Sequence, residues 1–136
     1  MILHAGDVCT VDVLEQLSRY APVHAVRGNN DLPEVAKWGA PETLEMKLDG
    51  LKVGMIHDSG QAAGRLERMR RRFPNADLVI FGHSHIPMDA ETAGFRIFNP
   101  GSPTDRRRQP HGTLGVLEIS GSQLLDARIV QLSSTY

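Results

Sequence analysis

The sequence has little of what marks several classes of protein. Among its 136 residues is one cysteine, Cys9, so no disulfide can form within the chain, which is typical of a reducing compartment. The formal net charge of −1 at pH 7 gives no charge-based reason to expect a nucleic acid or an anionic membrane as partner. No apolar run approaches the roughly 18 residues of a membrane span, and no charged, apolar leader opens the chain. We therefore expect a cytoplasmic protein.

The remaining composition is that of an ordinary globular protein. Hydrophobic residues make up 40% and charged residues 23% of the chain. A chain of 136 residues is long enough to bury a sizeable core and matches the usual size of one domain. We see no repeat or low-complexity tract, so we expect a single domain over residues 1–136.

Strand and helix patterns alternate in the first half of the chain. Apolar spacing predicts strands at 2–4 and 23–26 and a helix over 10–19 that Thr10 or Asp12 caps. Residues 43–57 alternate on both sides of Asp49-Gly50, which predicts a hairpin whose Leu44, Met46 and Leu48 face the core. A helix from about Ser59 to Pro74 and a fully buried strand at 78–81 follow.

The second half consists of short strand patterns separated by Gly, Pro and Asn turns. The segments "IPMDAE", "GFRIFNPGSP", "GTLGVLEIS" and "QLLDARIV" are typical of antiparallel hairpins. Alternating strands and helices followed by strands predict an α/β sandwich with sheets inside and helices outside.

Polar residues with ligand atoms stand at the ends of four predicted strands. They are Asp7, Asn29, His57, and His83 with His85. In folds of this class, sites form at the carboxyl ends of the strands, so we expect these side chains to meet. Imidazole, carboxylate and amide ligands together suit a divalent first-row metal such as Mn, Fe, Co, Ni or Zn. The sequence therefore predicts a metal site.

The motifs that hold these residues resemble a known family. "HAGD", "GNND", the His of "MIHD" and "GHSH" occur in the order and rough spacing of the calcineurin-like metallophosphoesterases, and "FNPGSPTDRR" is similar to their small single-domain phosphodiesterase branch. The resemblance covers essentially the whole chain. It implies a four-layer α/β/β/α sandwich and a hydrolase that cleaves small phosphate diesters with a metal-bound hydroxide.

The resemblance also implies a role for each site residue. Asp7 bridges two divalent ions, for which Mn is expected first and Zn, Fe, Co or Ni are alternatives. Asn29, His57 and His83 complete the coordination of one ion, and His85 binds the other. The candidate catalytic residues are Asn30 and Asp31. Asn30 takes the place of a residue that assists the leaving group, but its amide does not titrate, which favours substrates with good leaving groups. We expect Asp31 to orient His85 or another ligand.

One family motif has no counterpart here. The family's first strand ends in Asp-x-His and supplies two further ligands of the second metal, and no such segment precedes Met1. We therefore expect a fold without the first strand and its crossover, an incomplete second metal site and impaired activity. A start codon inside a longer reading frame would produce this opening, and the alternative is a real variant of the site. The apolar sheet edge left open is expected to cause self-association.

The other polar residues are expected to have structural roles, or two roles remain possible for them. We expect His4, His24 and His111 to be structural and Cys9 a small buried residue, and we expect the arginines of 68–72 to be solvated surface. Arg106, Arg107 and Arg108 either form a solvated run or meet substrate phosphate. The alternative to an enzyme is a protein-binding scaffold, because the chain is also similar to the retromer subunit that shares this fold.

Overall fold

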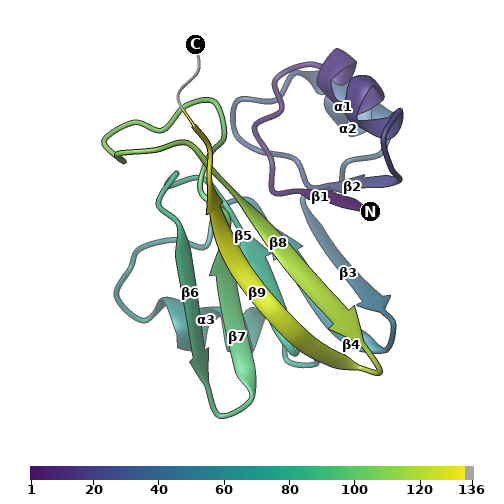
Figure 1. Cartoon of the computed structure of the whole chain (residues 1–136). Helices are drawn as coiled ribbons and strands as arrows, with labels where there is room; N and C mark the ends of the chain where they lie inside the picture. Colours follow the sequence, from purple (N-terminus) through teal and green to yellow (C-terminus); the bar gives the residue numbers. More distant parts are fainter. Residues whose placement is uncertain (134–136) are drawn as a thin grey trace.

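The computed structural model describes residues 1–133, which form a layered α/β structure (Figure 1). No helix among them is long and apolar enough to cross a membrane. Hydrogen bonds join the strands into three sheets, β1-β2, β3-β4-β5-β7-β6 and β8-β9. In chain order the elements are β1 (Ile2–His4), α1 (Val11–Ser18), β2 (Val23–Ala25), α2 (Pro33–Trp38), β3 (Thr43–Leu48), β4 (Leu51–Ile56), α3 (Arg65–Arg72), β5 (Leu78–Phe81), β6 (Met88–Thr92), β7 (Phe95–Asn99), β8 (Thr113–Ser120) and β9 (Gln123–Gln131).

A small parallel unit opens the chain. β1 and β2 pair in parallel and α1 is the crossover between them. The fully buried Leu14 of α1 packs in one cluster with Ala25 of β2 and Val35 of α2. The Thr10 side chain makes no capping hydrogen bond. The sequence pattern did not predict α2, because its six residues bury only Val35 and are too few to show helical spacing.

The five-stranded sheet forms the centre of the molecule. Its strands β4, β5 and β7 are parallel, and β3 and β6 pair antiparallel at its two edges. All four residues of β5 are buried, as its unbroken apolar run predicts. β3 and β4 form the predicted hairpin, and Asp49 and Gly50 both have positive φ, 47° and 86°, as a type I′ turn requires.

Separate layers cover the two faces of this sheet. On one face, Met55 and Phe98 belong to a cluster against which Leu3, near the chain start, and Leu117 of β8 pack. The predicted core residues Leu44, Met46 and Leu48 pack against this same cluster. On the other face, α3 packs through Met69 and Phe73 onto Val79, Phe81, Phe95 and Ile97. The layers run α1 and α2, then β1-β2 and β8-β9, then the central sheet, then α3, which is the expected α/β/β/α sandwich (Figure 1).

The helix expected from Ser59 begins instead at Arg65. The guanidinium of Arg68 donates hydrogen bonds to the backbone carbonyls of Ser59, Gln61 and Ala63. These bonds hold residues 59–63 as a loop, because the carbonyls that a longer helix would use are already bound to a side chain.

The expectation that the arginines of residues 68–72 are solvated is wrong for Arg68 and Arg70, which are half-buried, and is confirmed for Arg71 and Arg72, which are exposed. Arg68 binds the loop before the helix, the Arg70 guanidinium lies 5.2 Å from the centre of the Phe95 ring, and that of Arg72 lies 5.4 Å from the Phe73 ring. Arg71 is exposed. The long side chains cover aromatic surface while their charges stay near water, which periodicity in the sequence does not reveal.

Candidate metal centre

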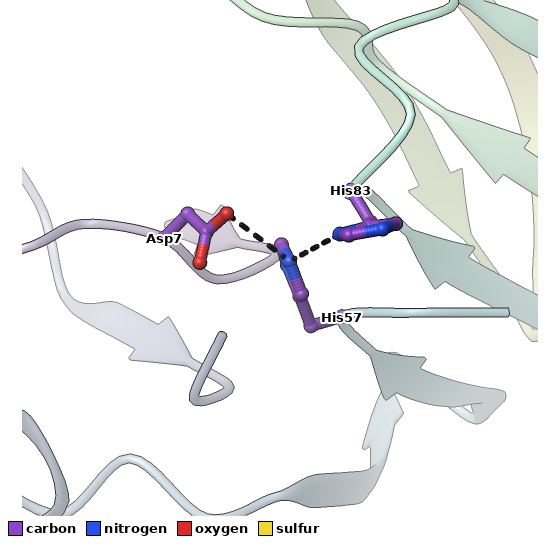
Figure 2. Close-up of side chains that lie close together, drawn as sticks. All are labelled: Asp7, His57 and His83. Atoms are coloured by element: carbon purple, nitrogen blue, oxygen red, sulfur yellow. Dashed lines mark hydrogen bonds and ion pairs between the residues drawn. The ribbon is translucent and has the colours of Figure 1, made fainter. Parts of the chain in front are cut away.

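Four candidate ligands meet where β1, β2, β4 and β5 end. Asp7 follows β1, Asn29 follows β2, His57 comes directly after β4, and His83 follows β5. Figure 2 shows Asp7, His57 and His83 with their side chains directed toward one another. One potential ligand atom from each of these three residues lies within 4.8 Å of the others. Two different sheets therefore deliver ligands to one point.

The Nε2 atom of His57 lies at the middle of this cluster. It is 3.2 Å from Oδ2 of Asp7, 2.9 Å from Oδ1 of Asn29 and 3.3 Å from Nδ1 of His83. The His83 Nδ1 atom is also 3.2 Å from the same Asn29 oxygen. His57 is 5% exposed, so its ring is held by packing as well as by these contacts.

The tautomer of His57 suits the cluster to a cation. Its Nδ1 atom is 2.7 Å from the backbone carbonyl of Ala5, and a carbonyl only accepts, so Nδ1 carries the proton. The Nε2 of a neutral ring then offers a lone pair toward a carboxylate oxygen of Asp7 and the amide oxygen of Asn29. Three acceptors that face one another are satisfied by a cation at their centre, and this ligand set suits a divalent first-row metal.

The backbone is strained at the same place. In the described residues, eight residues other than glycine have positive φ, and three of these, Asp49, Ala93 and Ser122, lie in hairpin turns. Such conformations cost on the order of 1 kcal/mol each and collect at functional sites. The remaining five lie in the loops around the cluster; they are Asp7 (59°), Cys9 (68°), His83 (66°), His85 (62°) and Arg107 (49°).

Two glycines let the chain pass close to the ligands. A Cβ atom at Gly28 would lie 2.3 Å from Oδ1 of Asp7, and one at Gly6 would lie 2.6 Å from Nδ1 of His57. Neither distance is tolerable without displacing the ligand. The glycines of "HAGD" and "GNND" are thus part of the site, since any side chain there would occupy the space of Asp7 or His57.

Asp31 positions Asp7 through the backbone. Its carboxylate accepts hydrogen bonds from the backbone N–H groups of Asp7 (3.0 Å), Cys9 (2.7 Å) and Gly28 (2.6 Å). We expected it to orient His85 or another ligand, and its three partners are main-chain N–H groups, one of which belongs to the candidate ligand Asp7. One carboxylate therefore ties the loop after β1 to the loop after β2.

Asn30 binds the carboxylate of Asp7 directly. Its backbone N–H donates to Oδ1 at 2.8 Å and its side-chain Nδ2 donates to Oδ2 at 3.1 Å. Two donors on one carboxylate fix its orientation toward His57.

His85 is not brought into the cluster. Its Nδ1 atom donates to the backbone carbonyl of Asp105 and lies 3.7 Å from Oδ2 of the same residue. In the described part of the chain, the residues with ligand atoms within 4.8 Å of one another are Asp7, His57 and His83, without His85. The Nε2 atom is the nitrogen of His85 that remains for a ligand.

Asn99 is a residue of the site that sequence reasoning missed. It is fully buried, and its Nδ2 donates to the carbonyl of Gly82 at 3.0 Å and to Oγ of Ser84 at 3.2 Å. Asn99 thereby holds the loop that carries both histidines of "GHSH". A polar residue at the end of the apolar run "FRIF" was the available signal.

The remaining histidines and the cysteine lie outside the cluster. His4 accepts a hydrogen bond from the backbone N–H of Gly6 through Nδ1 at 3.2 Å, as expected for a histidine that supports a turn. His24 and His111 are exposed. Cys9 is exposed rather than buried, because the strained turn after Asp7 directs it outward.

The burial of His4 predicts a pH dependence of stability. Burial lowers the pKa of His4 below its ordinary value of 6.5, and the nearby Asp31 opposes this only in part. Below about pH 6.5 the unfolded chain takes up a proton at His4 and the folded chain does not, so folding stability falls as the pH falls, by at most about 1.4 kcal/mol per pH unit for one proton.

Chemical denaturation with a chelator present, at about pH 7.5 and about pH 5.5, measures this effect. His4→Asn keeps an acceptor oxygen near the Nδ1 position and does not titrate, so its stability should fall less on acidification than that of the native chain. Equal acid sensitivity of the two proteins would rule out His4 as the group responsible.

Comparison with known proteins places these motifs in a family. Residues 1–122 match the model of the calcineurin-like phosphoesterase superfamily domain. A "probable metallophosphoesterase" of Methanothermobacter thermautotrophicus is 35% identical over 133 residues, which are 96% of this chain and 75% of that protein.

Solved structures share the fold. Vps29 from Entamoeba histolytica, determined as a zinc complex, is 25% identical, with a TM-score of 0.76 over 96% of this chain and 79% of that one. An archaeal phosphodiesterase has the same TM-score at 22% identity, over 96% of this chain and 81% of that one. The chain therefore belongs to the calcineurin-like phosphoesterase superfamily, the metallophosphoesterases, whose members are hydrolases that bind divalent metals.

Proposed function

We propose that this chain is a metal-dependent phosphodiesterase. The observation that carries the proposal is the meeting of acceptor atoms around Nε2 of His57. Asp7, Asn29, His57 and His83 would hold one divalent cation, for which we propose Mn²⁺, with Zn²⁺, Fe²⁺, Co²⁺ and Ni²⁺ as alternatives. Asp7 and the free Nε2 of His85 are the candidates for an incomplete second site.

When bound, such a cation lowers the pKa of a coordinated water and neutralises negative charge on a phosphoryl oxygen. The residues around it hold the geometry. Asn30 orients the Asp7 carboxylate, and Asp31 fixes the backbone that carries it. The Nδ1–H of His57 is held by the Ala5 carbonyl, which leaves Nε2 free for the cation.

The proposed substrates are phosphate diesters with good leaving groups. The Asn30 side chain donates to Asp7 and has no titratable proton, so it is unsuited to protonating a leaving alkoxide. Diesters whose leaving group departs as a stable anion, such as activated aryl esters, need no such proton. They should be cleaved faster than alkyl monoesters.

The test is hydrolysis of bis(p-nitrophenyl) phosphate with Mn²⁺ and with a chelator. We expect turnover in the presence of Mn²⁺ and none with the chelator. His83→Ala should abolish turnover, and His24→Ala, which removes an exposed histidine of β2, should not. A chain that binds Mn²⁺ at this site and shows no turnover would contradict the proposed activity.

A protein-binding scaffold is the second candidate function. The similarity to Vps29, at 25% identity and a TM-score of 0.76, favours it. A scaffold has no need for an aligned set of acceptors, so His57→Ala would leave partner binding intact. Metal binding without turnover would favour the scaffold function over the phosphodiesterase function.

We further propose that residues 1–136 act as one domain in a reducing compartment such as the cytoplasm. Elements from both halves of the chain build the site, and the single exposed cysteine forms no internal disulfide.

We also propose that the chain self-associates through its sheet edges. Within residues 1–133, β1 pairs only with β2 and β8 only with β9, although Leu3 and Leu117 pack against the same core cluster. Each strand of these two-stranded sheets therefore has one edge with unpaired backbone groups, beside apolar side chains. Size-exclusion chromatography with light scattering should give a mass of two or more chains that falls on dilution. A monomer at every concentration would exclude this association.

A further inference from the structure

A segment after β7 lies against the loop that carries His83 and His85. The buried Asn99 binds the carbonyl of Gly82, the backbone carbonyl of Asp105 accepts from His85, and Nη1 of Arg107 donates to the carbonyl of His83 at 3.1 Å. Three residues of the segment 99–107 thus hold the histidine loop. The third of these contacts places a guanidinium directly beside a candidate metal ligand.

The structure separates the three neighbouring arginines of this segment. Arg106 donates to the backbone carbonyl of Gln109 at 2.7 Å and so closes its own turn. Arg108 makes no side-chain hydrogen bond or ion pair in the described part of the chain. Among the three, Arg107 binds a residue of the metal cluster, through the backbone carbonyl of His83, and its own backbone is strained, with φ of 49°.

The charge of Arg107 is not neutralised within residues 1–133. None of the ion pairs there includes it, and the nearby Asp105 carboxylate accepts from the Arg107 backbone N–H at 3.3 Å. A guanidinium has five N–H donors, and the bond to His83 uses one. An exposed, anchored guanidinium with free donors matches the planar pair of oxygens on a phosphate group.

We propose that Arg107 binds the non-bridging oxygens of the substrate phosphate beside the metal held by Asp7, Asn29, His57 and His83. The proposal rests on the proposed function and adds a specificity-determining residue to it. The bond to the His83 carbonyl holds the guanidinium in place before substrate arrives, so less side-chain freedom is lost on binding. Monoanionic diesters and inorganic phosphate are the ligands that this arrangement recognises.

The test is calorimetric titration of the Mn²⁺-loaded protein with inorganic phosphate. Arg107→Ala should raise the Kd for phosphate by about tenfold to hundredfold, the effect of losing a hydrogen bond between charged groups. Arg107→Lys keeps the charge but loses the bidentate geometry of the guanidinium. Its Kd for phosphate should lie between those of the native chain and of Arg107→Ala. Arg108→Ala removes the same charge from the next residue and should leave the Kd unchanged. In turnover of bis(p-nitrophenyl) phosphate, Arg107→Ala should raise KM more than it lowers kcat.

The outcomes separate this proposal from the proposed function. Equal phosphate affinity of Arg107→Ala and Arg108→Ala overturns the role of Arg107 even if the native chain hydrolyses diesters. A loss of Mn²⁺ affinity in Arg107→Ala as large as the loss of phosphate affinity also overturns it, because Arg107 would then act only through His83. A native chain that binds phosphate through Arg107 but hydrolyses nothing supports this proposal and contradicts the activity.

Discussion

Replacing His57 by alanine is expected to abolish Mn²⁺ binding and diester hydrolysis. Its Nε2 atom contacts the other three candidate ligands, so the variant loses the central ligand and leaves Asp7, Asn29 and His83 around an empty volume. Changes to groups that merely orient metal ligands cost 10- to 100-fold in affinity, so loss of a ligand should cost about 100-fold or more. Calorimetric titration with Mn²⁺ measures this directly.

Two further variants control for the fold. His57 is buried, so its removal also leaves a cavity and lowers the stability. The His83 side chain is 41% exposed, so His83→Ala should lose Mn²⁺ affinity with little change in Tm. His24→Ala, on the exposed side of β2, should change neither property. If folded His57→Ala and His83→Ala proteins both bind Mn²⁺ as tightly as the native chain, the cluster is not a metal site.

Replacing Asp31 by asparagine is expected to destabilise the fold and weaken metal binding together. The carboxylate accepts three backbone N–H bonds, and an asparagine amide would turn an NH₂ group toward at least one of those donors. Hydrogen bonds to a charged group contribute about 1.5–3 kcal/mol each, so we expect a loss of about 3 kcal/mol in the free energy of unfolding. Asp7 would also lose its fixed position, and Mn²⁺ affinity should fall with the stability.

Chemical denaturation and Mn²⁺ titration of the same variant check both effects. Asp12→Asn is the matched control, because Asp12 is an exposed carboxylate in the first turn of α1. It should cost at most about 1 kcal/mol, through the helix dipole alone. An Asp31→Asn protein as stable as the Asp12→Asn protein would show that the bonds of Asp31 are not what holds the loops of the site together.

Much of the site was predictable because strand ends are easy to recognise in the sequence. Each of Asp7, Asn29, His57 and His83 follows an apolar run, directly or after a short turn, and the topology of parallel strands sends such ends to one edge. The three hairpins were predictable for a similar reason, since alternation and turn residues act locally. Predicting these features requires only the identity of neighbouring residues and the direction of the strands.

The parts that sequence reasoning missed depend on side chains that bind the backbone far away in the chain. Asp31 binds Asp7, and Arg68 replaces helical bonds before α3. Asn99 and Arg107 hold the loop of His83 from a segment that follows β7. Apolar periodicity carries no signal for such contacts, because any surface polar residue has the same pattern in the sequence.

Binding of a divalent cation by the acceptors around Nε2 of His57 is tested most directly by anomalous diffraction from crystals grown with Mn²⁺. We predict a peak within bonding distance of Oδ2 of Asp7, Oδ1 of Asn29, Nε2 of His57 and Nδ1 of His83, and no peak there in crystals of His57→Ala. Native crystals with Mn²⁺ bound elsewhere and no peak among these four atoms would contradict the claim.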